Sequence, residues 1–365
     1  MSVERTITTS LGTSFRIIDS GTPPSNEVDY LTLVFLHGWG MPCSLGITDR
    51  LTAIALSKGV RFIGVNRRGY VGSSPYTPDE ARVLQHGTQE ERGAAYRDEG
   101  RRYAYLLDAL VQDGTVGAGG VAMVAWSIAN AYLNATVASI HDLPDKVRER
   151  LRGRVKAFIY FGALISFSAM STLVTNHLYY ILSEAGPRLM GLEKPPGYVP
   201  AEDKSVPPET QLQRAQAWYT AYFKHDLASH KIDGLQMRHG DPARPPTDVV
   251  HPYFWNRYTD PDGALPGDPA IFAPGVQPYI QAASDAALFD VRVRKAWGEP
   301  KVAYVYGDSS VWTAVWTAWA LEDEHEARGP NVPELLFKIV EGGNHQVSTP
   351  LATARHSPQP SPVCA

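Results

Sequence analysis

The feature that most constrains the fold of this chain is a series of short apolar runs that recur along its length. Strands that are buried on both faces lose the alternation of polar and apolar residues and are typical of parallel sheets. Helical patterns separate most of these runs, and strands that alternate with helices predict an α/β fold with a mostly parallel sheet and helices on both faces. The runs lie at residues 31–37, 61–66, 121–126, 156–161, 302–306 and 335–340.

The alternation stops between about Gly162 and Trp297. This stretch is rich in proline and contains aromatic clusters at 179–180, 218–223 and 253–255. We interpret it as two or three helices joined by long loops, lying over the strand ends as a lid.

The predicted organisation is one core that is interrupted by an insertion. The tail has four prolines and no periodic pattern, which is typical of a disordered segment. The segments are the N-terminal part of the core at 1–162, the lid at 163–296, the C-terminal part of the core at 297–349 and the disordered tail at 350–365.

Composition narrows the classes of function. The chain is 44% hydrophobic and 20% charged, as in a globular protein with a large core. A formal net charge of −4 leaves no basic footprint, so we expect no nucleic-acid partner. Two cysteines are too few for a disulfide framework, and the N-terminus lacks the apolar run of a signal peptide. These features favour a cytoplasmic location.

Two stretches without charged residues are long enough to span a bilayer, at 121–140 and 157–183. Both contain polar side chains that hydrocarbon would not accommodate, and the first reads as a buried strand that leads into a helix. We therefore expect no integral membrane span. Association of the second stretch with a membrane surface remains open.

A candidate nucleophile, Ser127, stands where a predicted strand gives way to a helix, in the sequence A-W-S-I-A over 125–129. Such a sharp turn lifts the hydroxyl out of the sheet, and the helix N-terminus favours negative charge beside it. The small residues two before and two after the serine suit the tight backbone. From these five residues alone, a buried serine at a strand end is an equal alternative.

Two glycine-containing turns supply the context for Ser127. H-G-W-G at 37–40 follows a buried strand, and the N–H groups of Trp39 and Ile128 are candidates for an oxyanion hole. The alternative is a plain glycine turn. G-G-N-H at 342–345 follows the last strand, where His345 is placed to act as a general base or to be an ordinary loop histidine.

These motifs resemble those of the α/β-hydrolase superfamily, in its lid-bearing branch of proline iminopeptidases, epoxide hydrolases and lipase-like esterases. H-G-W-G resembles the family's oxyanion turn, A-W-S-I-A its nucleophile elbow and G-G-N-H-Q its late histidine. N-R-R-G-Y-V-G-S-S at 66–74 resembles the D-x-R-G-x-G-x-S turn, with Asn66 in place of Asp. The resemblance covers residues 3–162 and 297–348 but not the lid.

The resemblance implies acyl transfer to water. Epoxide hydrolases and haloalkane dehalogenases of this superfamily carry Asp at the elbow, so the serine argues against both activities. The family's acid usually follows the next-to-last strand in a G-x-x-D pattern, but this chain reads G-D-S-S at 307–310, with Ser310 at the acid's position. Asp308, two residues early, is the nearest carboxylate. It is expected either to orient His345 or to cap the following helix.

The predicted function is therefore a serine hydrolase of the carboxylesterase or lactonase type, acting on an apolar small-molecule ester or lactone through an acyl-enzyme. The alternatives are a C–C bond lyase or hydrolase and a small-ligand receptor, which use the same fold. The sequence has no HExxH motif, no phosphate-binding loop and no dinucleotide fingerprint, so we expect no metal and no cofactor. The oligomeric state is left open.

Overall fold

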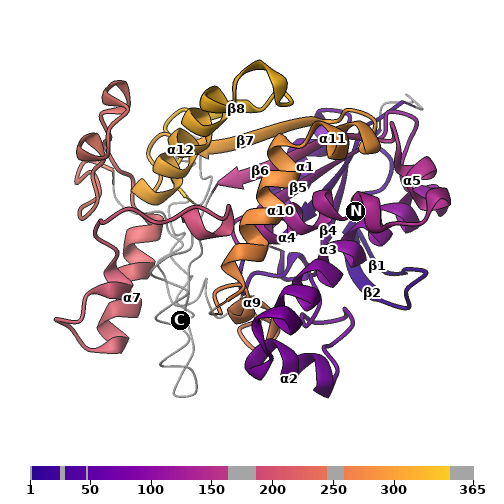
Figure 1. The fold of residues 1–365 in the computed structure, drawn as a ribbon, viewed down its shortest axis with the longest axis horizontal. Coiled ribbons are helices and arrows are strands. Elements are labelled where there is room, and N and C mark those ends of the chain that lie inside the picture. Colours follow the sequence, from indigo (N-terminus) through magenta and orange to yellow (C-terminus); the bar gives the residue numbers. More distant parts are fainter. Residues whose placement is uncertain are drawn as a thin grey trace, which may run out of the picture.

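The computed structural model describes residues 2–24, 29–46, 48–162, 186–244, 259–273 and 275–345. Within them, one eight-stranded sheet has the strand order β1-β2-β4-β3-β5-β6-β7-β8, and helices flank it (Figure 1). Strand β2 is antiparallel to both of its neighbours, whereas all pairs from β4 to β8 are parallel. The predicted α/β class with a mostly parallel sheet is confirmed. The strands are β1 Val3–Thr8, β2 Ser14–Asp19, β3 Thr32–Leu36, β4 Arg61–Val65, β5 Val121–Trp126, β6 Val155–Gly162, β7 Lys301–Gly307 and β8 Leu336–Val340.

The strand register brings the loops that carry the sequence motifs to one edge of the sheet. Leu36 at the end of β3 is level with Val65 of β4 and Ala125 of β5. The register continues across β6 and β7 to β8, where Gly307 is level with Val340. The carboxyl ends of parallel strands form the usual ligand-binding edge of such sheets.

Helices cover both faces, and apolar side chains fill the space between the layers. A large cluster on one face joins the sheet to α3, α4, α10 and α12, and a smaller cluster on the other face packs against α1. Helices α2 and α3 each begin in a capping box, in which Thr77 pairs with Glu80 and Thr88 with Glu91. The main helices are α1 Asp49–Ser57, α2 Pro78–His86, α3 Gln89–Gln112, α4 Ala129–Ala138, α5 Asp145–Leu151, α7 Pro208–Thr220, α9 Gly267–Ala270, α10 Gln277–Phe289, α11 Val291–Trp297 and α12 Trp312–Arg328.

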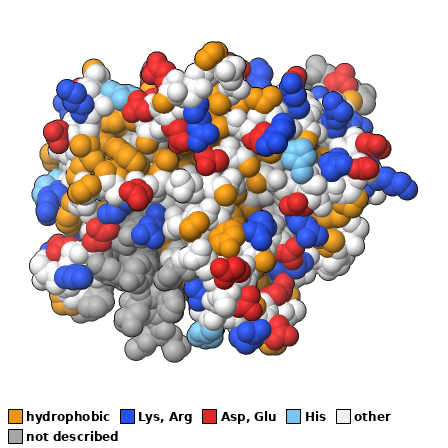
Figure 2. All heavy atoms as spheres, in the orientation of Figure 1, with side chains coloured by type: hydrophobic (Ala, Val, Ile, Leu, Met, Phe, Trp, Pro, Cys, Tyr) orange, Lys and Arg blue, Asp and Glu red, His pale blue; other side chains and the backbone are white. Residues whose placement is uncertain are grey.

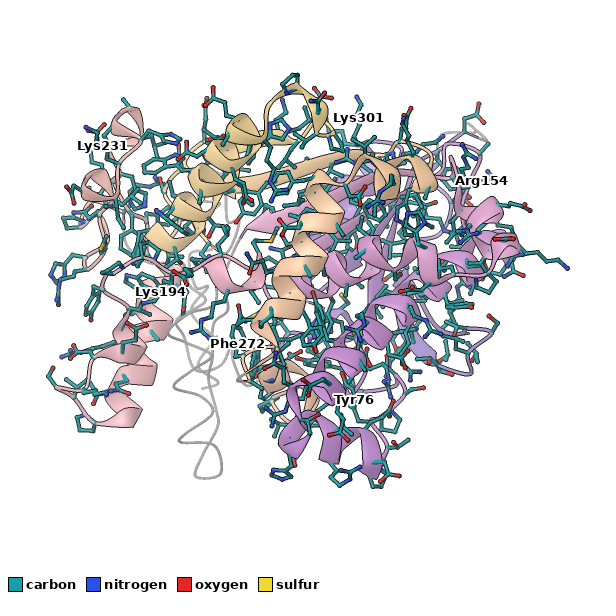
Figure 3. All side chains as sticks on the ribbon, in the orientation of Figure 1. Tyr76, Arg154, Lys194, Lys231, Phe272 and Lys301 are labelled. Carbon is teal, nitrogen blue, oxygen red and sulfur yellow. The ribbon has the colours of Figure 1, made fainter. Side chains whose placement is uncertain are left out.

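The insertion after β6 divides into two parts. Helix α7, the segment before it and the loops that follow it stand at the side of the sheet where α12 and β8 lie, and Lys194 and Lys231 mark this part (Figures 1 and 3). Helix α10 instead packs against α4. The helical layer therefore resumes at Gln277, inside the range assigned to the lid from the sequence. The aromatic clusters at 179–180 and 253–255, and the tail at 350–365, lie outside the described residues.

Within the described part of the chain, no helix is long and apolar enough to cross a membrane. The uncharged stretch at 121–140 is β5 followed by a turn and α4, as predicted. The stretch at 157–183 is described only as far as the end of β6. The face shown in Figure 2 carries acidic and basic side chains interspersed with one another.

Candidate active site

Ser127 occupies a strained turn between β5 and α4. Its φ angle is +62°, a left-handed value shared among non-glycine residues of the described chain only by His230 and Glu299. A side chain at such an angle is unfavourable and is typically retained where function requires it. The flanking Ala125 and Ala129 are fully buried, so larger residues would not fit there.

The hydroxyl of Ser127 has no exposed surface, and its Oγ has no hydrogen-bond partner among the described residues. Leaving a buried polar group unpaired costs about 1–3 kcal/mol. Ser127 is therefore a strained and buried serine at the carboxyl edge of the sheet.

The predicted oxyanion turn lies against Ser127. A Cβ atom placed on Gly38 would be 3.3 Å from the Cβ of Ser127 and 3.2 Å from the Trp126 ring, which explains why glycine stands there. Ile128 precedes the first residue of α4, and its N–H donates to no acceptor among the described residues. The structure thus brings the turn that carries Trp39 beside the turn that carries Ser127 and Ile128.

His345 ends the glycine loop after β8 and is fully buried. Its Nδ1 lies 3.4 Å from the Oγ of Ser310, and its ring centroid lies 5.4 Å from that of Tyr219. No hydrogen bond joins His345 to the Oγ of Ser127. The candidate base and nucleophile therefore follow β8 and β5 at the same edge of the sheet, with no hydrogen bond between them.

The structure does not bring Asp308 to His345. The Asp308 Oδ1 accepts a hydrogen bond of 2.9 Å from the Oγ of Ser309, and its N–H donates to the carbonyl of Val340. The side chain that lies beside the imidazole is that of Ser310, whose Oγ is 3.4 Å from the Nδ1 of His345. The reason is the tight turn after β7: the backbone of Asp308 continues the pairing with β8, while Ser310 is carried round beneath the imidazole.

Residues of the insertion form hydrogen bonds with the loop that carries His345, and none of them was predicted to be a site residue. The Nδ2 of Asn344 donates to the carbonyl of Thr220 at 2.8 Å, and Arg244 donates to the carbonyl of Gly342 at 2.8 Å. The Nε2 of His225 lies 2.8 Å from the carbonyl oxygen of Ser310. The aromatic cluster at 218–223 was the one sequence signal in this region.

Burial sets the charge of the two histidines in this region. Burial holds the pKa of His345 well below its ordinary value. The pKa of His37 is also well below its ordinary value, first because of burial and then because of the nearby Arg67 guanidinium. Both imidazoles are therefore neutral at pH 7.

This charge state predicts a pH dependence of stability. Below about pH 6.5 the unfolded chain binds protons at both histidines, whereas the folded chain does not. The contribution of these histidines to the free energy of unfolding is therefore fully present above that pH and is lost as the pH drops. Each imidazole contributes a slope of about 1.4 kcal/mol per pH unit in that window. We expect urea unfolding between pH 7.5 and 5 to show a shallower dependence in His345→Gln than in the wild type. Equal slopes would contradict the buried, neutral state of His345.

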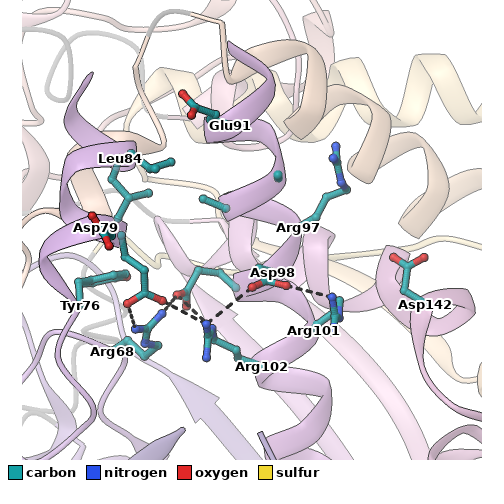
Figure 4. A pocket seen from close by; sticks show the side chains of 15 residues that line it. Arg68, Tyr76, Asp79, Leu84, Glu91, Arg97, Asp98, Arg101, Arg102 and Asp142 are labelled. Atoms are coloured by element: carbon teal, nitrogen blue, oxygen red, sulfur yellow. Dashed lines mark hydrogen bonds and ion pairs between the residues drawn. The ribbon is translucent and has the colours of Figure 1, made fainter. Parts of the chain in front are cut away.

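A cleft of about 620 Å³ opens elsewhere on the surface, between α2 and α3 (Figure 4). Some of its charged side chains pair with one another: Arg68 with Glu80 at 2.8 Å, and Arg102 with Glu80 at 3.1 Å. Ser127 and His345 do not line it. The cleft is therefore separate from the candidate active site.

No protein-family model matches this sequence, and no curated protein matches it. Solved structures resemble it at low identity. A mutant epoxide hydrolase of Vigna radiata is 15% identical, covers 94% of this chain with 93% of its own length and has a TM-score of 0.45. The bromoperoxidase of Bacillus anthracis is 16% identical with the same coverage and a TM-score of 0.44. A laboratory-evolved variant of potato epoxide hydrolase is 15% identical, covers 95% of this chain with 94% of its own length and has a TM-score of 0.46.

These neighbours assign no activity to the chain, because likeness at such identities concerns the fold alone. The strand order, the antiparallel β2, the helices on both faces and the strained serine after β5 give the fold independently. The chain therefore has the α/β-hydrolase fold.

Proposed function

We propose that this protein is a serine hydrolase that cleaves an ester or lactone of an apolar small molecule through an acyl-enzyme on Ser127. The observation that carries the proposal is Ser127 itself, held at a φ of +62° with a buried, unpaired Oγ beside a glycine turn. Strain and an unsatisfied hydroxyl at one residue are costs that a purely structural serine would not retain.

In the proposed reaction, the Nε2 of His345 takes the proton of the Ser127 hydroxyl while Oγ attacks the carbonyl carbon of the substrate. The N–H groups of Trp39 and Ile128 stabilise the negative charge that forms on the carbonyl oxygen. The intermediate collapses, and His345 passes its proton to the departing alkoxide, which leaves an ester on Ser127. Water activated by His345 then hydrolyses that ester by the same steps.

The lack of a hydrogen bond between His345 and Ser127 is compatible with this role. Hydrogen bonds between catalytic groups are often long or absent without substrate and form in the complex. Both side chains are fully buried, so a bound substrate would react out of contact with bulk water. Exclusion of water strengthens the interaction of the oxyanion with the two N–H groups.

An aromatic cluster beside His345 supports an apolar substrate. Tyr219 contacts the imidazole, and the Trp218 ring packs edge-on to Tyr219 and to Phe223, with centroids 4.9 Å and 5.8 Å apart. Ligand pockets are mostly lined by such side chains. We infer that the acyl or alcohol group lies against this cluster.

A chain-length series of p-nitrophenyl esters tests this proposal. We expect kcat/KM to rise at least about tenfold from acetate to medium-chain acyl groups, because each buried methylene adds about 0.8 kcal/mol. Ser127→Ala is the control for background hydrolysis. A series in which acetate is the best substrate would contradict the apolar pocket, and a lack of turnover with every ester would contradict the hydrolase.

The second candidate is a protein of this fold that does not hydrolyse esters, either a C–C bond lyase or a small-ligand receptor. It is favoured by one observation: Ser310, a neutral residue, lies 3.4 Å from the Nδ1 of His345, at the sequence position where the acid was expected. Without a carboxylate partner the imidazolium is poorly stabilised, and the base is weak. This candidate predicts that an apolar ester binds equally to the wild type and to Ser127→Ala and is recovered unchanged from both.

A further inference from the structure

A buried ion pair links the segment that returns from the insertion to the predicted oxyanion turn. Arg67 and Asp268 are 201 residues apart and almost fully buried, and both carboxylate oxygens accept from the guanidinium, with Nη2 to Oδ2 at 2.8 Å. Removing two charges from water costs about as much as their attraction returns, so such a pair adds little to stability. A role other than stability would explain why the pair is present, and one such role is to fix the backbone geometry of the turn at 37–40.

The remaining donors of Arg67 go to the backbone of the oxyanion turn. Its Nε donates to the carbonyl of His37 at 3.0 Å, and its Nη2 donates to the carbonyl of Gly38 at 3.1 Å. The N–H of Arg67 donates to the Nε2 of His37, so the proton of that imidazole is on Nδ1, which donates to the same Gly38 carbonyl at 2.6 Å. Two donors thus hold one carbonyl oxygen.

That carbonyl shares a peptide bond with the N–H of Trp39. In a planar trans peptide, C=O and N–H point in opposite directions. Holding the Gly38 oxygen toward Arg67 and His37 therefore aims the Trp39 N–H away from them. A rotation of this one peptide would remove the predicted donor from the oxyanion hole without any change in the nucleophile.

Two tyrosines complete the arrangement. The Tyr70 hydroxyl donates to Asp268 at 2.6 Å and accepts from the N–H of Gly40 at 2.8 Å, which fixes the turn on the other side of Trp39. The Tyr132 hydroxyl, from the helix that follows Ser127, donates to Asp268 at 3.3 Å. Asp268 thus contacts donors from both the nucleophile helix and the turn that supports the oxyanion loop.

We propose that Asp268 is a positioning residue, which sets the direction of the Trp39 N–H through Arg67 and Tyr70. This proposal rests on the proposed function of Ser127. It implies that the described end of the insertion helps to assemble the oxyanion hole.

The decisive variants are Asp268→Asn, which keeps the shape but places an amide against the guanidinium, and Tyr70→Phe, which removes one hydroxyl and leaves the ion pair intact. Asp108→Asn is the matched control, because Asp108 is as buried as Asp268 and also binds an arginine. Asp108 lies on α3, away from the oxyanion turn, and its two carboxylate oxygens accept from Nε and Nη2 of Arg150 on α5 at 2.7 Å and 2.8 Å. The readouts are kcat and KM for the best ester, the rate constant for fluorophosphonate labelling of Ser127, the melting temperature, and hydrogen exchange of a peptide over residues 37–41.

We expect Asp268→Asn to lower kcat and the labelling rate at least about tenfold with KM within about threefold, since loss of one oxyanion donor costs about 10²–10³-fold in kcat. Tyr70→Phe should lower both by a smaller factor. Exchange at 37–41 should become about tenfold faster in Asp268→Asn, and Asp108→Asn should change only the melting temperature.

The proposal fails if Asp268→Asn loses thermal stability as Asp108→Asn does while kcat, labelling and exchange stay within twofold of the wild type. If Asp268→Asn does not fold, Tyr70→Phe decides in the same way. A wild type that neither labels nor turns over esters defeats the proposed function, not this inference, because the exchange measurement still reports whether Asp268 holds the turn.

Discussion

Ser127→Ala is expected to abolish fluorophosphonate labelling and to lower kcat/KM for the best ester by about 10⁴-fold or more. The reason is that the alanine leaves the oxyanion donors and the imidazole in place but removes the only atom that forms the acyl-enzyme in the proposed reaction. Intact-protein mass spectrometry of the labelled protein measures the first effect, and ester turnover measures the second.

A double-mutant comparison sharpens this prediction. Groups that act as one unit are strongly non-additive, so His345→Gln alone and the double variant should lose about as much activity as Ser127→Ala. Losses that multiply would mean that the two residues act independently. Labelling that persists in Ser127→Ala would place the nucleophile elsewhere.

Ser127→Gly separates the loss of the nucleophile from damage to the fold. Glycine adopts a φ of +62° without the penalty of about 1–2 kcal/mol that an L side chain meets there. We expect Ser127→Gly to be as inactive as Ser127→Ala but to unfold at a higher temperature. That result would show that stability is given up at this residue to hold the hydroxyl in place.

The parts of the fold that follow from local sequence were predicted correctly. The run at 121–126 is buried on both faces and becomes β5, and the run at 61–66 becomes β4. Helix α2 was not predicted although Thr77, Pro78 and Glu80 form a recognisable helix start. Leu84 is its one buried residue, so the helix lies almost entirely at the surface.

Helices α10 and α11 were absorbed into the predicted lid for a different reason. They follow one another with only Asp290 between them and no strand, so the alternation that identifies an α/β core is missing there. Asp290 caps α11 by accepting from the N–H of Arg292. Only the packing of α10 on α4 shows that this segment belongs to the helical layer.

The site residues that lie in short motifs could be predicted from the sequence. Those that depend on contacts between distant parts of the chain could not. The elbow around Ser127 and the glycine turn at 37–40 are local, and the structure places them together. The Asp268–Arg67 pair joins residues 201 positions apart, and no periodicity indicates it. The choice between Asp308 and Ser310 as the partner of His345 depends on how a four-residue turn is wound, which the residue types alone do not determine.

Ser310→Asp is therefore expected to raise activity. The Oγ of Ser310 is 3.4 Å from the Nδ1 of His345, so a carboxylate at this position would meet the imidazole directly. A negative charge there stabilises the imidazolium that forms during attack, and loss of such an acid from complete triads costs about 10⁴-fold. Because Ser310 is fully buried and was not selected to hold a charge, we expect a smaller gain, of about tenfold or more in kcat.

The pH profile should change along with the rate. In the wild type, burial keeps the pKa of His345 well below its ordinary value, so activity should fall only well below pH 6.5. The new carboxylate favours the protonated imidazole, so the acid limb of kcat should move to higher pH in Ser310→Asp. The buried charge will also lower the melting temperature, and rates are therefore expressed per site titrated with the phosphonate.

Two controls decide whether the carboxylate itself is responsible. Ser310→Asn has the same size without the charge and should give no gain. Asp308→Asn should keep kcat within about twofold, because the Asp308 carboxylate binds Ser309 and not the histidine. A tenfold loss in Asp308→Asn, together with no gain in Ser310→Asp, would show that the turn rearranges in the substrate complex and that Asp308 is the acid after all.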